Sequence, residues 1–269
     1  MKNRINIILI SLLIILVSSC EDLFQYSPYA IDFNEDNRDL TNKNIDLLLS
    51  EKGDDTIKIA LTGDNHRWFD ELEDFVSAAN NVQGIDFTIH VGDIADFGLP
   101  QQYLWANSSL LKLDKPYFVV IGNHDLVGNG ADAYHEMFGK FDFSFIYNRT
   151  KFVFINTNSR EYEFNGSVPD IDWLDNQLQP NDNFKNVVVI FHVPPTDFDF
   201  DQQLIEQFHN TLAKYNNVLL TIHGHLHHFE TYRPFADSIL YLNTYGTQYK
   251  KFVVLKIIND KYEIEIKDF

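Results

Sequence analysis

The sequence has little cysteine and few basic residues. Its 269 residues include one cysteine, and 21 Lys and Arg residues stand against 39 Asp and Glu residues. A single cysteine excludes an intramolecular disulfide and a zinc cluster built from cysteines. The net charge of −18 argues against a protein that binds nucleic acid, because neutralising phosphates requires Lys and Arg. We therefore do not expect a nucleic-acid partner, and the sequence does not identify a protein partner.

Long apolar runs are also scarce, and the one that matters lies at the N-terminus. Lys2 and Arg4 precede an apolar stretch from residue 7 to residue 17, which is interrupted only by Ser11. This stretch is shorter than the roughly 20 residues that a membrane-spanning helix needs, and it has the proportions of a secretory signal peptide. It ends just before Cys20, the single cysteine. The arrangement resembles a bacterial lipoprotein signal; the alternative is an ordinary signal peptide followed by an incidental cysteine.

The lipoprotein interpretation predicts three parts of the chain. Residues 1–19 would be the signal peptide, residues 20–54 a tether lipidated at Cys20, and residues 55–269 the folded domain. Removal of residues 1–19 would take away two basic and no acidic residues, which brings the net charge to about −20. Two lipid chains on Cys20 would anchor the protein stably. We therefore expect an extracytoplasmic, lipid-anchored protein whose membrane contact is made through Cys20.

The chain from residue 56 onward alternates between predicted strands and predicted helices. Short β-branched and apolar runs predict strands, and apolar residues at helical spacing predict helices between them. Such alternation is typical of an α/β fold with a largely parallel sheet and an antiparallel end. The predicted strands cover 56–61, 87–91, 117–121, 187–191, 218–222, 239–242, 252–257 and 262–266, and the predicted helices lie around 68–79, 103–111 and 204–212.

Five of the predicted strands end at clusters that contain Asp, Asn or His. Ligands of open α/β sheets bind beyond the carboxyl ends of strands, so these clusters should meet at one edge. Carboxylate, amide and imidazole groups suit hard and borderline divalent cations. The clusters are Asp64-Asn65-His66, Gly92-Asp93-Ile94-Ala95-Asp96, Gly122-Asn123-His124-Asp125, His192-Val193-Pro194-Pro195 and Gly224-His225-Leu226-His227.

These motifs, in this order, resemble those of the calcineurin-like metallophosphoesterase family: D-x-H, G-D, G-N-H-[DE], H and G-H-x-H. The stretches between them are similar to the class III cyclic-nucleotide phosphodiesterase branch. The resemblance covers the chain from about residue 57 onward. It implies a four-layer α/β/β/α sandwich and a metal-dependent phosphoesterase with two divalent cations, and the ligand types accept Mn, Fe, Zn or Co.

The resemblance also implies a role for individual residues. One cation would be bound by Asp64, His66 and His227, and the other by Asn123, His192 and His225. Asp93 would bridge the two cations, and a bridging hydroxide would attack a phosphodiester or phosphomonoester. His124 would be a catalytic residue that binds no metal, and Asp96 would orient it.

Two other functions remain open at this point: a metal-holding lipoprotein without turnover, and a nuclease of the same superfamily. The presence of both His124 and Asp96 argues against the first, because neither is needed to hold metal, and the acidic charge argues against the second. Among the remaining polar residues, His90 and His223 are expected to pack in the core. The roles of Arg160 and His228 are left open: each could contact substrate or occupy an ordinary surface position.

Overall fold

The computed structural model of the chain describes residues 27–51, 56–235 and 239–269. Residues from Ile31 to Phe269 form one compact unit. The predicted signal peptide and Cys20 lie outside the described residues. Within the described part of the chain, no helix combines the length and the apolar character needed to cross a bilayer.

The first sheet contains five strands, which meet in the spatial order β11-β10-β1-β2-β3. Strands β1, β2 and β3 are parallel, because β1 pairs with β2 and β2 with β3 in the same direction, whereas β10 runs antiparallel to both β1 and β11. The strands are β1 (Thr56–Thr62), β2 (Phe87–His90), β3 (Tyr117–Val119), β10 (Lys251–Ile258) and β11 (Lys261–Asp268).

The second sheet contains six strands in the order β4-β5-β6-β7-β9-β8. Strands β5, β6, β7 and β9 are parallel, and β4 and β8 close the two edges in the antiparallel direction. The β4–β5 hairpin was not predicted; Asn148 and Arg149 both have positive φ there, as a two-residue hairpin turn requires. The strands are β4 (Phe143–Tyr147), β5 (Thr150–Phe154), β6 (Asn186–Ile190), β7 (Val218–His223), β8 (Glu230–Tyr232) and β9 (Tyr241–Asn243).

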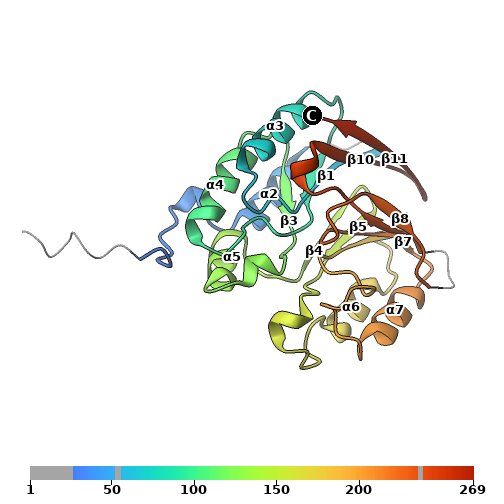
Figure 1. Cartoon of the computed structure of the whole chain (residues 1–269). Helices are drawn as coiled ribbons and strands as arrows, with labels where there is room; N and C mark the ends of the chain where they lie inside the picture. The colour runs from blue at the N-terminus through green and yellow to red at the C-terminus, as the bar shows by residue number, and fades with distance from the viewer. Residues whose placement is uncertain (1–26, 52–55, 236–238) are drawn as a thin grey trace, which may run out of the picture. The chain divides into compact units, whose positions relative to one another are not determined.

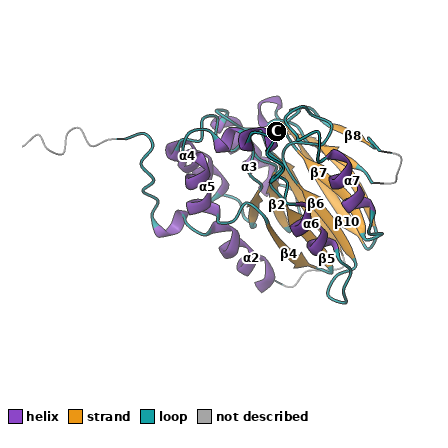
Figure 2. Ribbon diagram, turned by 90° about the horizontal axis from the view of Figure 1, so that it is seen from below, coloured by secondary structure: helices purple, strands orange, loops and turns teal. Residues whose placement is uncertain are grey.

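Helices cover the outer faces of the two sheets, with α3, α4 and α5 beside the first and α6 and α7 beside the second (Figures 1 and 2). Side chains alternate across each strand, so Ile59 and Leu61 pack between the sheets while Ala60 packs beneath the outer helices. The predicted four-layer α/β/β/α sandwich is confirmed. The helices are α3 (Phe69–Asn80), α4 (Pro100–Leu110), α5 (Gly130–Phe138), α6 (Ile171–Leu178) and α7 (Ile205–Ala213).

Residues 31–51 correct the predicted extent of the tether. They belong to the compact unit and include helix α2 (Leu40–Ser50). Phe33 and Leu40 are buried in the core beneath the outer helices, and Leu48 is buried in the core between the sheets. The helix was missed because Leu48 is flanked by Leu47 and Leu49, which are both more than half exposed; these three leucines in a row blur the helical period.

The parallel strands of both sheets end at the same edge of the sandwich. The residues that follow β1, β2 and β3 are tied together by backbone hydrogen bonds, with Val91 N donating to Thr62 O and Val120 N donating to His90 O. In the second sheet, Phe191 N, just beyond β6, donates to Ile222 O near the end of β7. The five motif clusters therefore leave neighbouring strands at neighbouring positions.

Candidate metal centre

The first group of predicted ligands comes from the segments after β1, β2 and β7. Asp64, His66, Asp93 and His227 each point one ligand atom toward a common point, with these atoms within 4.8 Å of one another. Nε2 of His66 lies 3.3 Å from Nε2 of His227 and 3.6 Å from Oδ2 of Asp93. Nε2 of His227 lies 3.4 Å from Oδ1 of Asp64. This is the set predicted for one cation together with the predicted bridging residue.

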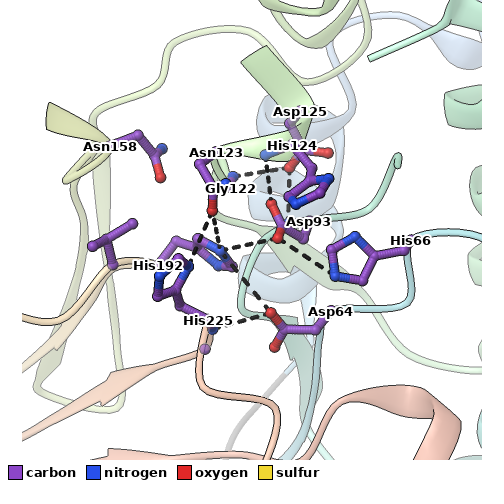
Figure 3. A network of polar contacts seen from close by, with 12 residues as sticks. Asp64, His66, Asp93, Gly122, Asn123, His124, Asp125, Asn158, His192 and His225 are labelled. Atoms are coloured by element: carbon purple, nitrogen blue, oxygen red, sulfur yellow. Dashed lines mark hydrogen bonds and ion pairs between the residues drawn. The ribbon is translucent and has the colours of Figure 1, made fainter. Parts of the chain in front are cut away.

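The second group lies on the other side of Asp93 (Figure 3). Oδ1 of Asn123 is 3.1 Å from both Nε2 of His192 and Nδ1 of His225. Nε2 of His192 is also 3.2 Å from Oδ2 of Asp93. Asp93 therefore contacts a histidine of each group through the same oxygen atom. The structure brings all seven predicted ligands together in two adjoining groups.

The backbone adopts an uncommon conformation at most of these ligands. Non-glycine residues rarely have φ values near +50°, and Asp, Asn and His tolerate them better than most. Such strain persists only where the surrounding fold holds it, and it is concentrated at functional sites. Here the positive φ values turn the side chains of five ligands toward the centre shortly after the strands end. The ligands with positive φ are Asp64 (49°), His66 (47°), Asp93 (55°), His225 (73°) and His227 (61°).

Gly122 is required by the close approach of Asp93. A Cβ atom at Gly122 would lie 2.2 Å from both the backbone nitrogen and Oδ1 of Asp93. Since real Cβ atoms do not approach other atoms this closely, any side chain at this position would displace the shared carboxylate.

The ligand histidines are held through their second ring nitrogen. Nδ1 of His192 lies 2.7 Å from the backbone oxygen of Val91, and because a carbonyl only accepts, that nitrogen donates. Such partners fix the tautomer and orientation of a ligating imidazole. His225 Nε2 lies 3.3 Å from Asp197 Oδ1, and His66 Nδ1 lies 3.7 Å from Asp96 Oδ1. The amide Nε2 of Gln248 lies 3.3 Å from Nδ1 of His227; because an amide nitrogen only donates, this contact orients the ring without accepting a proton from it.

Sequence reasoning missed Asp197 and Gln248 as supports of the centre. Neither lies in a motif: Asp197 follows His192 by five residues, and Gln248 lies in the 3₁₀ helix Thr247–Tyr249 before β10. No local signal would have found Gln248. The acidic pair at 197 and 199, close behind a ligand histidine, is the one signal that was present for Asp197.

Asp125 is a further support, and its place as the last letter of G-N-H-D was a usable signal. It is fully buried and accepts hydrogen bonds from the backbone N–H groups of Gly122, Asp93 and Ala95 at 2.8–3.0 Å. Burial, with the nearby Asp93 carboxylate, raises the pKa of Asp125 to about 7, against the effect of these donors. Asp125 thus joins the segments that carry Asp93 and Asn123.

His124 lies beside both groups and is more accessible than most of the ligands. Its side chain is 41 % exposed, and its backbone N–H donates to Oδ1 of Asp93 at 2.9 Å. Its Nδ1 is 2.9 Å from the backbone oxygen of Asp96 and 3.5 Å from the Asp96 carboxylate. A pocket of about 260 Å³ lies next to His124, and Arg67 and Trp68 form part of its wall.

Burial and the carboxylates of the centre act in opposite directions on its titratable groups. Burial raises the pKa of Asp64 to about 6 and lowers that of His66 to about 4. Burial also opposes the charged form of His192, but the carboxylates of Asp93 and Asp64 outweigh it and raise its pKa to about 10. Burial likewise opposes the charged form of Asp93, yet His192 holds the pKa of that carboxyl below its usual range.

The residues present fit divalent cations. Oδ2 of Asp64 is buried without a hydrogen-bond partner among the described residues. Two imidazole nitrogens, of His66 and His227, face each other at 3.3 Å, and Nε2 of His192 faces the oxygen of Asn123. Because Nδ1 of His192 donates to Val91, a neutral His192 would face Asn123 with a lone pair. A cation between such acceptors would satisfy all of them.

Several other polar residues find different partners. His90 is fully buried and contacts Asn65 at 2.8 Å, and His223 is fully buried and stacks on Phe191, so both pack in the core as expected. Arg160 forms ion pairs with Glu161 and Asp199. His228 is 58 % exposed and lies 3.4 Å from Glu230.

Comparison with known proteins agrees with this geometry. The model of the calcineurin-like phosphoesterase family matches residues 57–229. A probable cyclic nucleotide phosphodiesterase of Coxiella burnetii is 29 % identical over 232 residues, which cover 78 % of this chain and 91 % of that protein. A probable glycerophosphodiester phosphodiesterase of Arcobacter nitrofigilis is 26 % identical over 163 residues, 54 % of this chain and 58 % of that protein.

Among solved structures, a dimetal phosphatase from Danio rerio has a similar fold. It superposes with a TM-score of 0.65 at 14 % sequence identity, over 79 % of this chain and 96 % of that one.

Proposed function

The chain belongs to the calcineurin-like phosphoesterase family of metal-dependent phosphoester hydrolases, and from this premise we propose that it hydrolyses phosphodiesters at a centre of two divalent cations. The two similar curated proteins named above are both named probable phosphodiesterases, one for cyclic nucleotides and one for glycerophosphodiesters. Their names support a diester substrate, without separating these two kinds.

The observation that carries the proposal is the position of Asp93 between two ligand groups. Its Oδ2 lies 3.6 Å from His66 in one group and 3.2 Å from His192 in the other. One carboxylate in contact with both groups is the arrangement that holds two cations a few Å apart. Asn123 contributes an uncharged oxygen, which leaves the centre positive enough to attract a phosphate anion.

Two cations bound at these ligands would polarise the phosphoryl oxygens and activate water near neutral pH. The protein itself holds the ligands in place through Asp125, Asp197 and the carbonyl of Val91. His124 faces the pocket from a fixed position and would donate a proton to the departing ester oxygen. Asp96, 3.5 Å from the His124 ring, would stabilise the charged imidazole that donates it.

We further propose that the reaction takes place outside the cytoplasm. This location is supported by the apolar run that ends before Cys20, which resembles a lipoprotein signal. A strongly acidic domain is poorly suited to lie flat on anionic lipid, so a lipid anchor is the means of attachment that fits the charge.

A substrate panel tests the activity. The full chain, purified in detergent and supplied with Mn²⁺, is assayed on 4-nitrophenyl phosphate, bis(4-nitrophenyl) phosphate, a 3′,5′-cyclic nucleotide, a glycerophosphodiester and plasmid DNA. We expect hydrolysis of the diesters to exceed that of the monoester, and we expect Asp93→Ala to abolish it. Faster monoester hydrolysis would contradict the diester preference. Metal binding without hydrolysis of any ester would favour a binding protein, and cleavage of the plasmid would favour a nuclease.

A further inference from the structure

The loop that follows β6 contacts His225 from the side away from the proposed cations. The two ring nitrogens of His225 face different partners: Nδ1 lies 3.1 Å from Asn123, and Nε2 lies 3.3 Å from Oδ1 of Asp197 and 3.7 Å from Oδ2 of Asp199. The side chains of Asp197 and Asp199 are 25 % and 19 % exposed. The His225 ring is thus held between an amide of the metal centre and a pair of carboxylates.

The carboxylate of Asp197 is held by its own loop. The backbone N–H of Asp199 donates to Oδ1 of Asp197 at 2.9 Å, and the N–H of Asp197 donates to the backbone oxygen of Pro194 at 3.0 Å. Because His192 precedes this turn by two residues, the same short segment supplies one ligand of the second group and supports another.

Arg160 anchors this loop to the segment that follows β5. Its Nη1 lies 2.5 Å from Oδ2 of Asp199, and its backbone N–H donates to the backbone oxygen of Asp199 at 3.2 Å. Its Nε and Nη2 donate to the carboxylate of Glu161 at 3.0 and 2.8 Å. The guanidinium group therefore joins the two loops, and its donors on both sides are already engaged.

We propose that Asp197 is a positioning residue for His225, and that Arg160, acting through Asp199, holds Asp197 in place. A carboxylate only accepts hydrogen bonds, so Asp197 keeps the proton of His225 on Nε2 and leaves the lone pair of Nδ1 directed at the second ligand group. The inference rests on the proposed function, because it assigns these residues to the affinity of the second cation site.

A third cation bound by Asp197, Asp199 and His225 is the competing interpretation. Such a cation would need the lone pair of Nε2, which would put the ring proton on Nδ1, facing Asn123 and the second group. The same imidazole could then no longer serve the second site. The carboxylate of Asp199 is also already paired with Arg160, so the two carboxylates are better matched to a hydrogen-bonding role than to a cation site.

Metal affinity is the first test. Mn²⁺ binding by the full chain is measured for Asp197→Ala, Asp197→Asn and Arg160→Gln, with Asp175→Ala as the control. Asp175 is 29 % exposed and forms an ion pair with Lys214 between α6 and α7, far along the chain from any ligand. We expect Asp197→Ala to weaken one of two sites by about 10- to 100-fold, with the other unchanged.

The other variants separate positioning from a general loss of structure. Asp197→Asn keeps an oxygen acceptor and should retain much of the affinity. Arg160→Gln should weaken the same site, and adding it to Asp197→Ala should cause little further loss, because both act on one hydrogen bond. Wild-type affinity at both sites in Asp197→Ala would overturn the inference, and so would additive losses.

The tautomer of His225 is the second test. Long-range ¹H–¹⁵N correlation spectra of the metal-free chain at pH 8 should show the proton on Nε2 in the wild type and a mixture of tautomers in Asp197→Ala. A wild type with the proton on Nδ1, or with three tight Mn²⁺ sites, would overturn the inference in favour of the third cation. A wild type that binds fewer than two cations would instead contradict the proposed function, which separates the two failures.

Discussion

His124 donates the proton of its Nδ1 to the backbone carbonyl oxygen of Asp96, 2.9 Å away, while the carboxylate of Asp96 lies farther off, at 3.5 Å. The main chain of residue 96 therefore sets the orientation and tautomer of the ring. The carboxylate, which also lies 3.7 Å from His66 and 3.5 Å from Arg67, contributes charge. Removing the side chain of residue 96 and removing that of His124 should accordingly have different consequences.

Replacing His124 tests its role as a proton donor. We expect His124→Ala to retain both cations and to lose roughly 10²- to 10⁴-fold in kcat on alkyl esters, with a smaller loss on nitrophenyl esters. A nitrophenolate leaves without much help from an acid, whereas an alkoxide needs a proton. Steady-state kinetics on matched alkyl and nitrophenyl diesters measure the difference, and equal losses on both would reject the acid role.

Asp96→Asn is the companion to this variant. Because the backbone hydrogen bond to His124 remains, we expect the same leaving-group pattern at smaller amplitude. A loss as large as that of His124→Ala would show instead that the carboxylate has a direct part in the reaction.

Replacing Asp93 tests the shared ligand. Its carboxylate contacts a histidine of each group, so Asp93→Ala should weaken both cation sites together, while His227→Ala should weaken mainly one. Elemental analysis after gel filtration should find well under two metal equivalents per chain for Asp93→Ala. Two tightly held cations in this variant would show that the bridging residue has been misassigned.

Adding a methyl group at Gly122 tests the packing of the centre without removing a ligand. Gly122→Ala would place Cβ against the nitrogen and carboxylate of Asp93, and we expect loss of metal affinity from the displacement. Gly166→Ala is the control: Gly166 has a positive φ of 79°, and a Cβ atom there meets nothing within 4 Å. It should cost about 1 kcal/mol of stability and leave metal binding unchanged. Normal metal affinity in Gly122→Ala would contradict this account.

Titration of Asp142, which is not a ligand of the metal centre, should make the stability of the fold depend on pH. Burial raises its pKa to about 6, and its Oδ1 accepts a hydrogen bond from the backbone N–H of Asn156 at 2.7 Å. The folded state binds this proton more tightly than the unfolded state, where the pKa is 3.8. The contribution of Asp142 to stability is therefore greatest below about pH 4 and is lost as the pH rises through about 6.

Asp142→Asn removes this penalty while keeping an oxygen to accept from Asn156. We expect the variant to exceed the wild type by up to about 3 kcal/mol in free energy of unfolding at pH 8, with the difference vanishing at pH 4. Urea unfolding across this range measures it, with Asp182→Asn, at an exposed position, as the control. A constant difference at all pH values would exclude titration of Asp142 as its cause.

Replacing Cys20 tests the proposed anchor. Lipid attaches through the cysteine thiol, so Cys20→Ala should remove the lipid and shift the protein out of the membrane fraction or leave its signal peptide uncleaved. Ser18→Ala, which keeps the thiol, should fractionate as the wild type does. Mass spectrometry of the N-terminus distinguishes the forms, and an unchanged mass and distribution for Cys20→Ala would refute lipidation.

The layers of the fold and the ligand set follow from local patterns in the sequence. The apolar runs that became β1, β6 and β7 begin and end within one or two residues of the predicted bounds, because a buried parallel strand must be apolar along its length. Each of these runs stops at a polar cluster. Because the carboxyl ends of parallel strands share an edge, the sequence alone predicted that five residues would lie near one another: Asp64, Asp93, Asn123, His192 and His225.

Tertiary structure alone decided which residues support those ligands and where the domain begins. Asp197 contacts His225 across 28 residues of sequence, and Gln248 contacts His227 from the 3₁₀ helix that precedes β10. Such contacts depend on how two loops face each other, and no local period records that. The sequence could not identify helix α2 for the same reason. Of its three consecutive leucines only Leu48 is buried, and only the packing of the helix in the folded chain shows which of them faces the core. Hydrophobic periodicity is a property of neighbouring residues, whereas the hydrogen bonds that orient a ligand join segments that only the folded chain brings together.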